Sequence, residues 1–274
     1  MNLSQILLKP TAKPIPLSIP DCVLWLNGQT KVEDSGGNFP DNAENIAAWK
    51  SLGTPTEHSA AQSTDNNRPS YLTNALDSRG GVTFVAADSN YLTITDPSDL
   101  DFAHDDNFTM FIAGTVDLVS ASSFFCVKAA PGDNVFASPN FGFDWIFSSS
   151  GTRPNFRIRA NPDEGEDTLV QCKVGAGDAL SINEDFILTI RMNWSGFLQQ
   201  WKNGGSAVSA DVSSLTGTLA TAGNFILGSR LGGNPFDGKL TEFIVYRNNL
   251  TDAQINLVGN YIGDKYASLS WTDI

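Results

Sequence analysis

The fold class depends on residues 225–267, FILGSRLGGNPFDGKLTEFIVYRNNLTDAQINLVGNYIGDKYA. Their glycine cluster is either a phosphate-binding loop or a turn between two strands, and these two interpretations predict different folds. A phosphate-binding loop needs GxxxxGK[ST], or GxGxxG between a strand and a helix, so that backbone N–H groups meet the anion. Here the order is GxxxGG, and the segment after the last glycine, KLTEFIVYR, is strand-like. We therefore interpret the glycines as a hairpin turn between two strands, in which Asn234-Pro235 and Asp237-Gly238 are the turn residues.

A helix follows this second strand. Thr251 is placed as its N-cap and Gln254 lies three residues later, which is the capping-box pattern that satisfies free backbone donors. Ile255, Val258 and Ile262 recur at helical spacing, so one apolar stripe can cover part of a sheet. The pattern predicts one short C-terminal helix.

Upstream of residue 225, β signals dominate. The runs CVLWLNG (22–28) and FTMFIAGTV (108–116) are apolar, whereas FGFDWIF (141–147), NFRIRA (155–160) and FILTIRMNW (186–194) alternate, as half-buried strands do. In FLQQWKNGGSAV, Asn203-Gly204 predicts a hairpin with a tight type I′ turn. Residues 42–51, NAENIAAWKS, are interpreted as a short helical turn. The expected fold class is all-β, a two-sheet antiparallel sandwich.

Composition narrows the function. The chain has 274 residues, a net charge of −13 and a pI of about 4.4, and such acidity excludes nucleic acid, which binds clustered Lys and Arg. The three cysteines, Cys22, Cys126 and Cys172, show no metal spacing and are expected to be buried free thiols. No run is long enough to span a membrane, and residues 1–20 do not read as a signal peptide.

Sequence motifs near the two ends of residues 22–267 together resemble those of a known family. The order Gly-x-Arg strand, Phe-x-Gly loop, strand ending in Tyr246 and Leu-Thr-Asp helix start is similar to the C-terminal end of concanavalin A-like, LamG-type lectin/glucanase domains. The upstream match consists of Leu24, Trp25, Trp49, Gln62, Arg68, Pro69, Val82, Phe84, Tyr91 and Leu92. The resemblance covers roughly residues 22–267 and implies a two-sheet antiparallel jelly roll. Domains of this kind are frequent in bacteriophage virion proteins and in secreted bacterial proteins.

Catalysis is not expected. Glucanases of the resembling family carry Glu-x-Asp-x-x-Glu on one strand, which sets two carboxylates about 5 Å apart on one face, and this chain lacks that motif. Glu242 is expected to make a structural hydrogen bond near the sheet rim. His58 and His104 are expected to be exposed loop residues, and no GxSxG accompanies them.

Sugar binding would need aromatic rings to stack on the sugar and polar side chains to bind its hydroxyls. The candidate ligand-binding residues are Asp144, Trp145, Arg230, Asn234 and Asp237. Trp25, Trp49 and Trp201 are expected to be core residues, because they fall at positions of the resembling family that look like core. A core position is also the competing interpretation for Trp145. Trp194 and Trp271 are expected to be exposed.

A metal site is left open. The stretch DPSDLDFAHDD contains Asp96, Asp99, Asp101, Asp105 and Asp106, and NPDEGED contains Asp163, Glu164, Glu166 and Asp167. Calcium takes six to eight oxygen ligands, often several from one loop, but neither stretch has EF-hand spacing. Calcium binding and simply solvated acidic loops are the two alternatives; no other cofactor is expected.

These observations predict two domains: an extended, proline-rich arm over residues 1–20 and a jelly roll over residues 21–274. The first functional hypothesis is a non-enzymatic structural protein of a phage virion, either a capsid decoration (cement) protein or a tail-fibre component, assembled in the host cytoplasm. The arm would dock on other virion proteins and the chain would form a homo-oligomer or lattice. The docking residues would be Pro10, Pro14, Pro16 and Pro20. The alternative is a lectin-like module that binds host-surface glycans, and a glycan-degrading enzyme comes third for want of the carboxylate pair.

Overall fold

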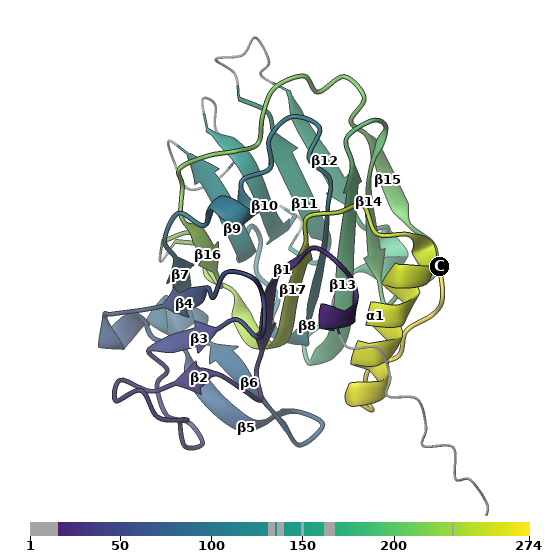
Figure 1. Ribbon diagram of the computed structural model, residues 1–274. Coiled ribbons are helices and arrows are strands. Elements are labelled where there is room, and N and C mark those ends of the chain that lie inside the picture. The colour runs from purple at the N-terminus through teal and green to yellow at the C-terminus, as the bar shows by residue number, and fades with distance from the viewer. Residues whose placement is uncertain (1–15, 131–134, 136–139, 149–150, 162–167, 232) are drawn as a thin grey trace, which may run out of the picture.

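The protein is a sandwich of two antiparallel β-sheets with one α-helix on an outer face (Figure 1). The computed structural model describes residues 16–130, 135, 140–148, 151–161, 168–231 and 233–274. The predicted all-β sandwich with a short C-terminal helix is confirmed. Within the described ranges, no helix is long and apolar enough to cross a membrane.

The first sheet has eight strands, and β17 (Asp237–Tyr246) is central to it. Its order is β15 (Val208–Asp211), β14 (Phe197–Lys202), β13 (Glu184–Asn193), β8 (Phe108–Leu118), β17, β6 (Arg79–Phe84) and β5 (Ser70–Leu76). β1 (Cys22–Asn27) also pairs with β17. β6 pairs with the first part of β17 and β1 with the last part, so two short strands share one edge of β17.

The second sheet has nine strands and faces the first across the core. Its order is β12 (Leu169–Lys173), β11 (Pro154–Arg159), β10 (Phe141–Phe147), β9 (Phe124–Ala130), β16 (Phe225–Leu227), β7 (Leu92–Ile94), β4 (Ser59–Ala61), β3 (Ala48–Lys50) and β2 (Val32–Glu33). Short 3-10 helices interrupt the loops: η1 (Pro16–Ser18), η2 (Asp65–Asn67), η3 (Ala86–Asp88), η4 (Ser98–Leu100) and η6 (Ala176–Asp178).

The core between the sheets follows the alternation of the sequence. Phe143, Trp145 and Phe147 of β10 all face it, as do Phe186 and Leu188 of β13. Each large apolar side chain that is fully buried stabilises the fold by about 1.5–3 kcal/mol. The predicted alternation of these strands is confirmed.

Helix α1 (Asp252–Lys265) covers the outer face of the eight-stranded sheet (Figure 1). Thr251 and Gln254 form the predicted capping box. The buried stripe of the helix packs against outward-facing sheet residues in a second apolar cluster, which includes Trp25, Ile187 and Ile244. The helix therefore buries apolar side chains of β1, β13 and β17 that would otherwise face water.

The glycine-rich segment does lie between two strands, but it is not a hairpin. β16 pairs with β7 and β9 in one sheet, whereas β17 pairs with β1, β6 and β8 in the other. The segment thus crosses from one sheet to the other. Gly228 has a φ of 83°, and a Cβ there would lie 2.2 Å from the Phe84 ring. Glycine is needed because the chain turns against the core at this point.

Two further predictions about local structure are wrong. Residues 42–51 contain strand β3 and an isolated bridge from Asn45 to Ser70 instead of a helical turn. The predicted hairpin of β14 and β15 is present, but its turn is not the predicted one: pairing ends at Gln200 and Val208, so the connection is longer than a two-residue type I′ turn. Asn203 and Gly204 keep positive φ, and Gly204 forms a bridge with Thr272 of the C-terminal tail.

The last residues of the predicted N-terminal arm pack on the sandwich itself. Pro16 is buried and its carbonyl oxygen accepts a 3.0 Å hydrogen bond from the Tyr246 hydroxyl. Ile19 belongs to the apolar cluster under helix α1. Pro16 is therefore not available to dock on a partner, whereas Pro20 is exposed. Pro10 and Pro14 lie outside the described residues.

Candidate functional site

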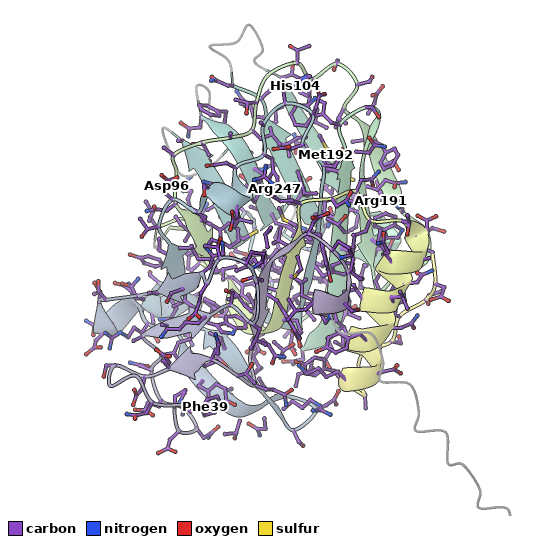
Figure 2. The ribbon with its side chains drawn as sticks, viewed as in Figure 1. Phe39, Asp96, His104, Arg191, Met192 and Arg247 are labelled. Carbon is purple, nitrogen blue, oxygen red and sulfur yellow. The ribbon has the colours of Figure 1, made fainter. Side chains whose placement is uncertain are left out.

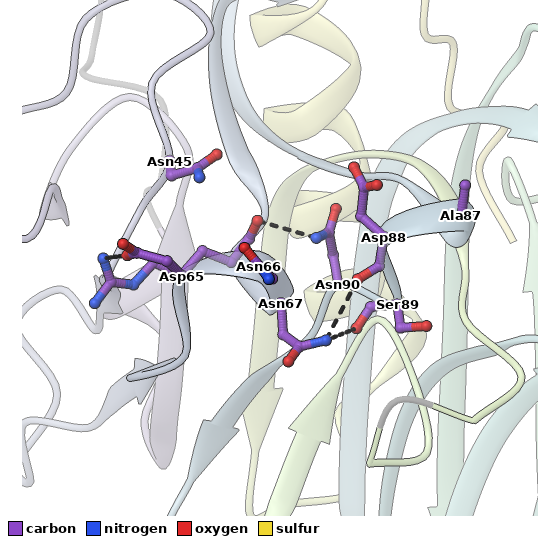
Figure 3. Close-up of a pocket in the computed structure, with 9 residues that line it drawn as sticks. Asn45, Asp65, Asn66, Asn67, Ala87, Asp88, Ser89 and Asn90 are labelled. Atoms are coloured by element: carbon purple, nitrogen blue, oxygen red, sulfur yellow. Dashed lines mark hydrogen bonds and ion pairs between the residues drawn. The ribbon is translucent and has the colours of Figure 1, made fainter.

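A polar hollow of about 520 Å³ opens beside η2 and η3 (Figure 3). Its volume lies within the range of about 300–1,000 Å³ that is typical of small-molecule sites. Nine residues line it, and all except Ala87 are polar or charged: Asn45, Asp65, Asn66, Asn67, Arg68, Ala87, Asp88, Ser89 and Asn90. Residues of several loops contribute to it.

Side-chain hydrogen bonds join the two turns that form the walls. The Asn67 amide nitrogen donates to the carbonyl oxygens of Asp88 and Ser89, both at 3.3 Å, so η2 is tied to η3 (Figure 3). Asn90 is buried; its side-chain oxygen accepts from the Val85 N–H at 2.8 Å, and its amide nitrogen donates to the Arg68 carbonyl at 3.0 Å. These bonds fix the spacing of the walls without filling the hollow.

Besides the half-buried Ser89 hydroxyl, three side chains at the hollow are left without a hydrogen-bond partner within the described part of the chain: Asn45, Asn66 and Asp88. All three are exposed. Together they offer amide donors, amide acceptors and a carboxylate to a ligand. The Arg68 guanidinium, in contrast, is held by Asp65 and by the carbonyl oxygens of Gln62 and Ser63.

Of the predicted ligand-binding residues, Asp237 alone contacts an element of this hollow. Its carboxylate accepts a 3.0 Å hydrogen bond from the Ala86 N–H at the start of η3. Asp237 therefore helps to hold η3 in place without lining the hollow itself. Arg230 forms a tight turn with Gly233 through two backbone hydrogen bonds, and the Asn234 carbonyl accepts from the Phe124 N–H. Neither residue lines the hollow.

Asp144 and Trp145 are both fully buried, which corrects their assignment as sugar contacts. The Trp145 ring packs edge-on against Phe156 in the core and has no exposed surface for stacking. Asp144 points to the opposite face of β10 and receives two hydrogen bonds from Arg157, at 2.7 and 2.6 Å. Burial raises the pKa of the Asp144 carboxyl, and the Arg157 guanidinium opposes this shift.

Glu242 is structural, as expected, but it lies in the middle of the sheet and not at its rim. It is fully buried beneath helix α1, accepts a 2.7 Å hydrogen bond from the Trp25 indole N–H and another from the Tyr266 hydroxyl, and pairs with Lys265. Burial raises the pKa of this carboxyl above its ordinary value of 4.5 despite the Lys265 ammonium. No substrate could reach the carboxylate without displacing the helix.

The acidic residues 96–106 do not converge on one point: Asp96 and Asp101 both face Lys128, whereas Asp106 pairs with Arg247. Lys128 is buried, and its ammonium lies 2.9 Å from Asp101 and 2.7 Å from the carbonyls of Thr221 and Gly223. Figure 2 shows Asp96 and His104 well apart. Within the described residues, no group of three or more His, Cys, Asp or Glu side chains could hold a metal. The second acidic stretch, with Asp163, Glu164, Glu166 and Asp167, lies outside the described residues, so both alternatives for it, calcium binding and solvated loops, stay open.

Several single-residue expectations are confirmed and others are wrong. The three cysteines are buried and free, and Trp25, Trp49 and Trp201 are core residues, as predicted. Trp194 is buried, and so is His58, whose ring nitrogen lies 3.1 Å from the Asp99 carboxylate. His104 is exposed and Trp271 is half-buried. The residues that line the hollow were missed because TDNNRP and AADSN look like ordinary polar turns in the sequence.

No family model matches this chain and no curated protein matches its sequence, so the concanavalin A-like label remains a resemblance. Solved structures do match by fold. The binding domain of Paraclostridial Mosquitocidal Protein 1 aligns with 88% of this chain and 52% of its own, at 13% identity and a TM-score of 0.61.

Two further matches have similar coverage of this chain. The ligand-binding domain of botulinum neurotoxin serotype D, solved with N-acetylneuraminic acid, aligns over 90% of this chain and 52% of its own, at 13% identity and a TM-score of 0.51. Trypanosoma rangeli sialidase, solved with the inhibitor DANA, aligns over 87% of this chain and 32% of its own, at 10% identity and a TM-score of 0.54. The chain thus spans about half the length of these two binding domains. At these identities the likeness shows the fold alone: this chain has a β-sandwich like those in these two binding domains and in the sialidase.

Proposed function

We propose that this chain is a non-enzymatic carbohydrate-binding domain that holds its glycan in the hollow between η2 and η3. The observation that carries the proposal is the set of three exposed, unpartnered side chains, Asn45, Asn66 and Asp88, on walls held in place by Asn67 and Asn90. Sugar hydroxyls both donate and accept, and amide and carboxylate groups match both roles.

The environment of the hollow suits a hydroxyl-rich ligand better than an apolar one. No aromatic side chain is among the nine described residues that line it, so stacking contributes nothing there. Binding then depends on hydrogen bonds made at an open surface, where water competes. A net contribution of about 0.5–1.5 kcal/mol per hydrogen bond predicts modest affinity for a single sugar unit.

The fold matches support the choice of ligand class. Two of the similar structures are binding domains, one of them from a botulinum neurotoxin and solved with N-acetylneuraminic acid, and the third is a sialidase. These ligands belong to those proteins. The virion role implied by the sequence resemblance, with capsid or tail proteins as partners, remains a prediction that no described contact tests.

The test is a glycan array followed by titration calorimetry with the strongest ligand. The double variant Asn66→Ala/Asp88→Ala should lower affinity at least tenfold, which corresponds to about 1.4 kcal/mol. Asp178→Ala is the matched control because Asp178 is also the exposed last residue of a three-residue 3-10 helix, η6. The proposal is overturned if no glycan binds, or if the double variant binds as tightly as the unmodified protein.

A further inference from the structure

A second pocket, of about 210 Å³, lies on the outer face of the nine-stranded sheet, away from the core. Its floor spans the three strands β10, β11 and β12. One rung of the floor is Ile146, Asn155 and Lys173, which are paired neighbours across the strands. The next outward-facing rung places Arg157 beside Gln171. Because side chains alternate along a strand, residues two apart bring these two rungs to the same face.

Asn155 is the unusual residue of this floor. It is only 3% exposed, its amide nitrogen donates to the Gln171 side-chain oxygen at 2.9 Å, and its own side-chain oxygen has no hydrogen-bond partner. A buried acceptor left unpaired costs about 1–3 kcal/mol. A ligand hydroxyl placed in the pocket would supply the missing donor.

The charge of the pocket is opposite to that of the molecule. Lys173 forms no ion pair within the part of the chain that the structure describes. The Arg157 guanidinium lines the pocket while Asp144 fixes its orientation from the adjacent strand. In a chain with a net charge of −13, this leaves a local site that favours an anion.

We propose that this pocket binds one acidic sugar unit, whose carboxylate pairs with Lys173 while a hydroxyl donates to the Asn155 side-chain oxygen. The Ser122 and Ser148 side chains at the margin offer further polar contacts, and Ile146 supplies an apolar patch on the floor. The volume is below that of sites for drug-sized ligands, which fits a single ring. This site is separate from the hollow between η2 and η3, and the proposal does not depend on glycan binding there.

Three probes separate the two features of the ligand in NMR titrations that follow the Asn155 side-chain NH₂ signals. Glucuronate carries both the carboxylate and the hydroxyls, acetate carries the carboxylate alone, and glucose carries the hydroxyls alone. We expect glucuronate to bind at least tenfold more tightly than either other probe, and more weakly at high salt. Equal binding of acetate would reduce the pocket to a simple anion site, and equal binding of glucose would remove the role of Lys173; either result overturns the proposal.

Substitutions provide the second test. Lys173→Gln should weaken glucuronate binding at least tenfold and leave glucose unchanged, whereas Asn155→Asp should abolish glucuronate binding by adding a negative charge. Lys50→Gln is the matched control, since Lys50 also ends a strand and is half-buried but pairs with Glu33. If Asn155→Asp does not fold, Lys173→Gln decides the question alone. Unchanged binding in Lys173→Gln, or loss of glucuronate binding in Asp88→Ala, contradicts the proposal; the latter result would assign the ligand to the hollow.

Discussion

At the scale of single residues, buried charged side chains connect the elements of this fold. Glu242, Asp144 and Lys128 are all fully buried, and each is compensated by specific partners. Removing one partner of a buried ion pair leaves an uncompensated charge, which is far more costly than the loss of a surface pair. These three residues therefore hold elements in place and are not open to a ligand.

Glu242→Gln should lower the free energy of unfolding by about 1–3 kcal/mol near pH 5, because an amide NH₂ in place of one carboxyl oxygen leaves a buried donor, the Trp25 indole or the Tyr266 hydroxyl, without its acceptor. The folded-state pKa of Glu242 is raised above 4.5, so the folded protein retains this proton over a higher pH range than the unfolded chain does. The contribution of Glu242 to stability is thus complete below 4.5 and declines as pH rises through the folded-state pKa.

Denaturant unfolding at several pH values measures this effect, and the difference between the two proteins should shrink with rising pH. Asp117→Asn is the control, since Asp117 near the end of β8 pairs with Lys239 of β17 and both side chains are partly exposed. It should cost at most about 1 kcal/mol. A difference that grows with pH would contradict the assigned direction of the Glu242 pKa.

At the scale of elements, two local features set how β17 and α1 fit together. A register shift between Leu240 and Glu242 marks a bulge in β17. It places Leu240 on the same face as Phe243 and Val245, in the core, although strict alternation would put Leu240 with Ile244. The bulge thereby leaves Glu242 on the outer face, where Lys265 and Tyr266 of the helix end reach it.

The capping box of α1 offers a direct test at this scale. Thr251→Ala removes the side-chain acceptor for the Gln254 N–H and should destabilise the protein by about 1 kcal/mol in thermal or denaturant unfolding. Thr251→Ser should restore most of the loss because serine also caps well. Thr56→Ala is the control at an exposed loop threonine and should change stability by less than about 0.5 kcal/mol. An equal effect of both alanine variants would argue against a role of the cap.

At the scale of the whole molecule, both sheets contribute to one continuous core. The largest apolar cluster includes Leu24 and Phe243 from one sheet and Phe143 and Phe225 from the other. The segment after β16 passes between the sheets at Gly228, so neither sheet can be separated without breaking the same set of contacts. Residues that are distant in the sequence are therefore expected to unfold together.

We expect a single cooperative unfolding transition in denaturant, with coincident curves from tryptophan fluorescence and far-UV circular dichroism. The buried tryptophans Trp145 and Trp201 report on different layers, the main core and the cluster beneath the helix. Two separated transitions, or curves that do not coincide, would show that the helix-covered layer unfolds independently of the sandwich core.

Properties that depend on neighbours along the chain could be predicted from the residues alone. Alternation in residues 141–147 and 186–194 predicts which side chains face the core, and the pattern from Thr251 to Gln254 predicts the start of the helix. It also excluded a phosphate loop at the glycine cluster. These predictions hold because strand pleating and helix capping act within a few residues.

Which segments meet in space became clear from the three-dimensional fold. It placed β16 and β17 in different sheets, put the bulge into β17, buried Trp145 and His58, and joined η2 to η3 around the hollow. A tryptophan beside an aspartate has the same local pattern whether it faces solvent or core, because burial depends on the element packed above it. The candidate sites arise where turns or strands that are far apart in the sequence come together, and no short-range pattern encodes that contact.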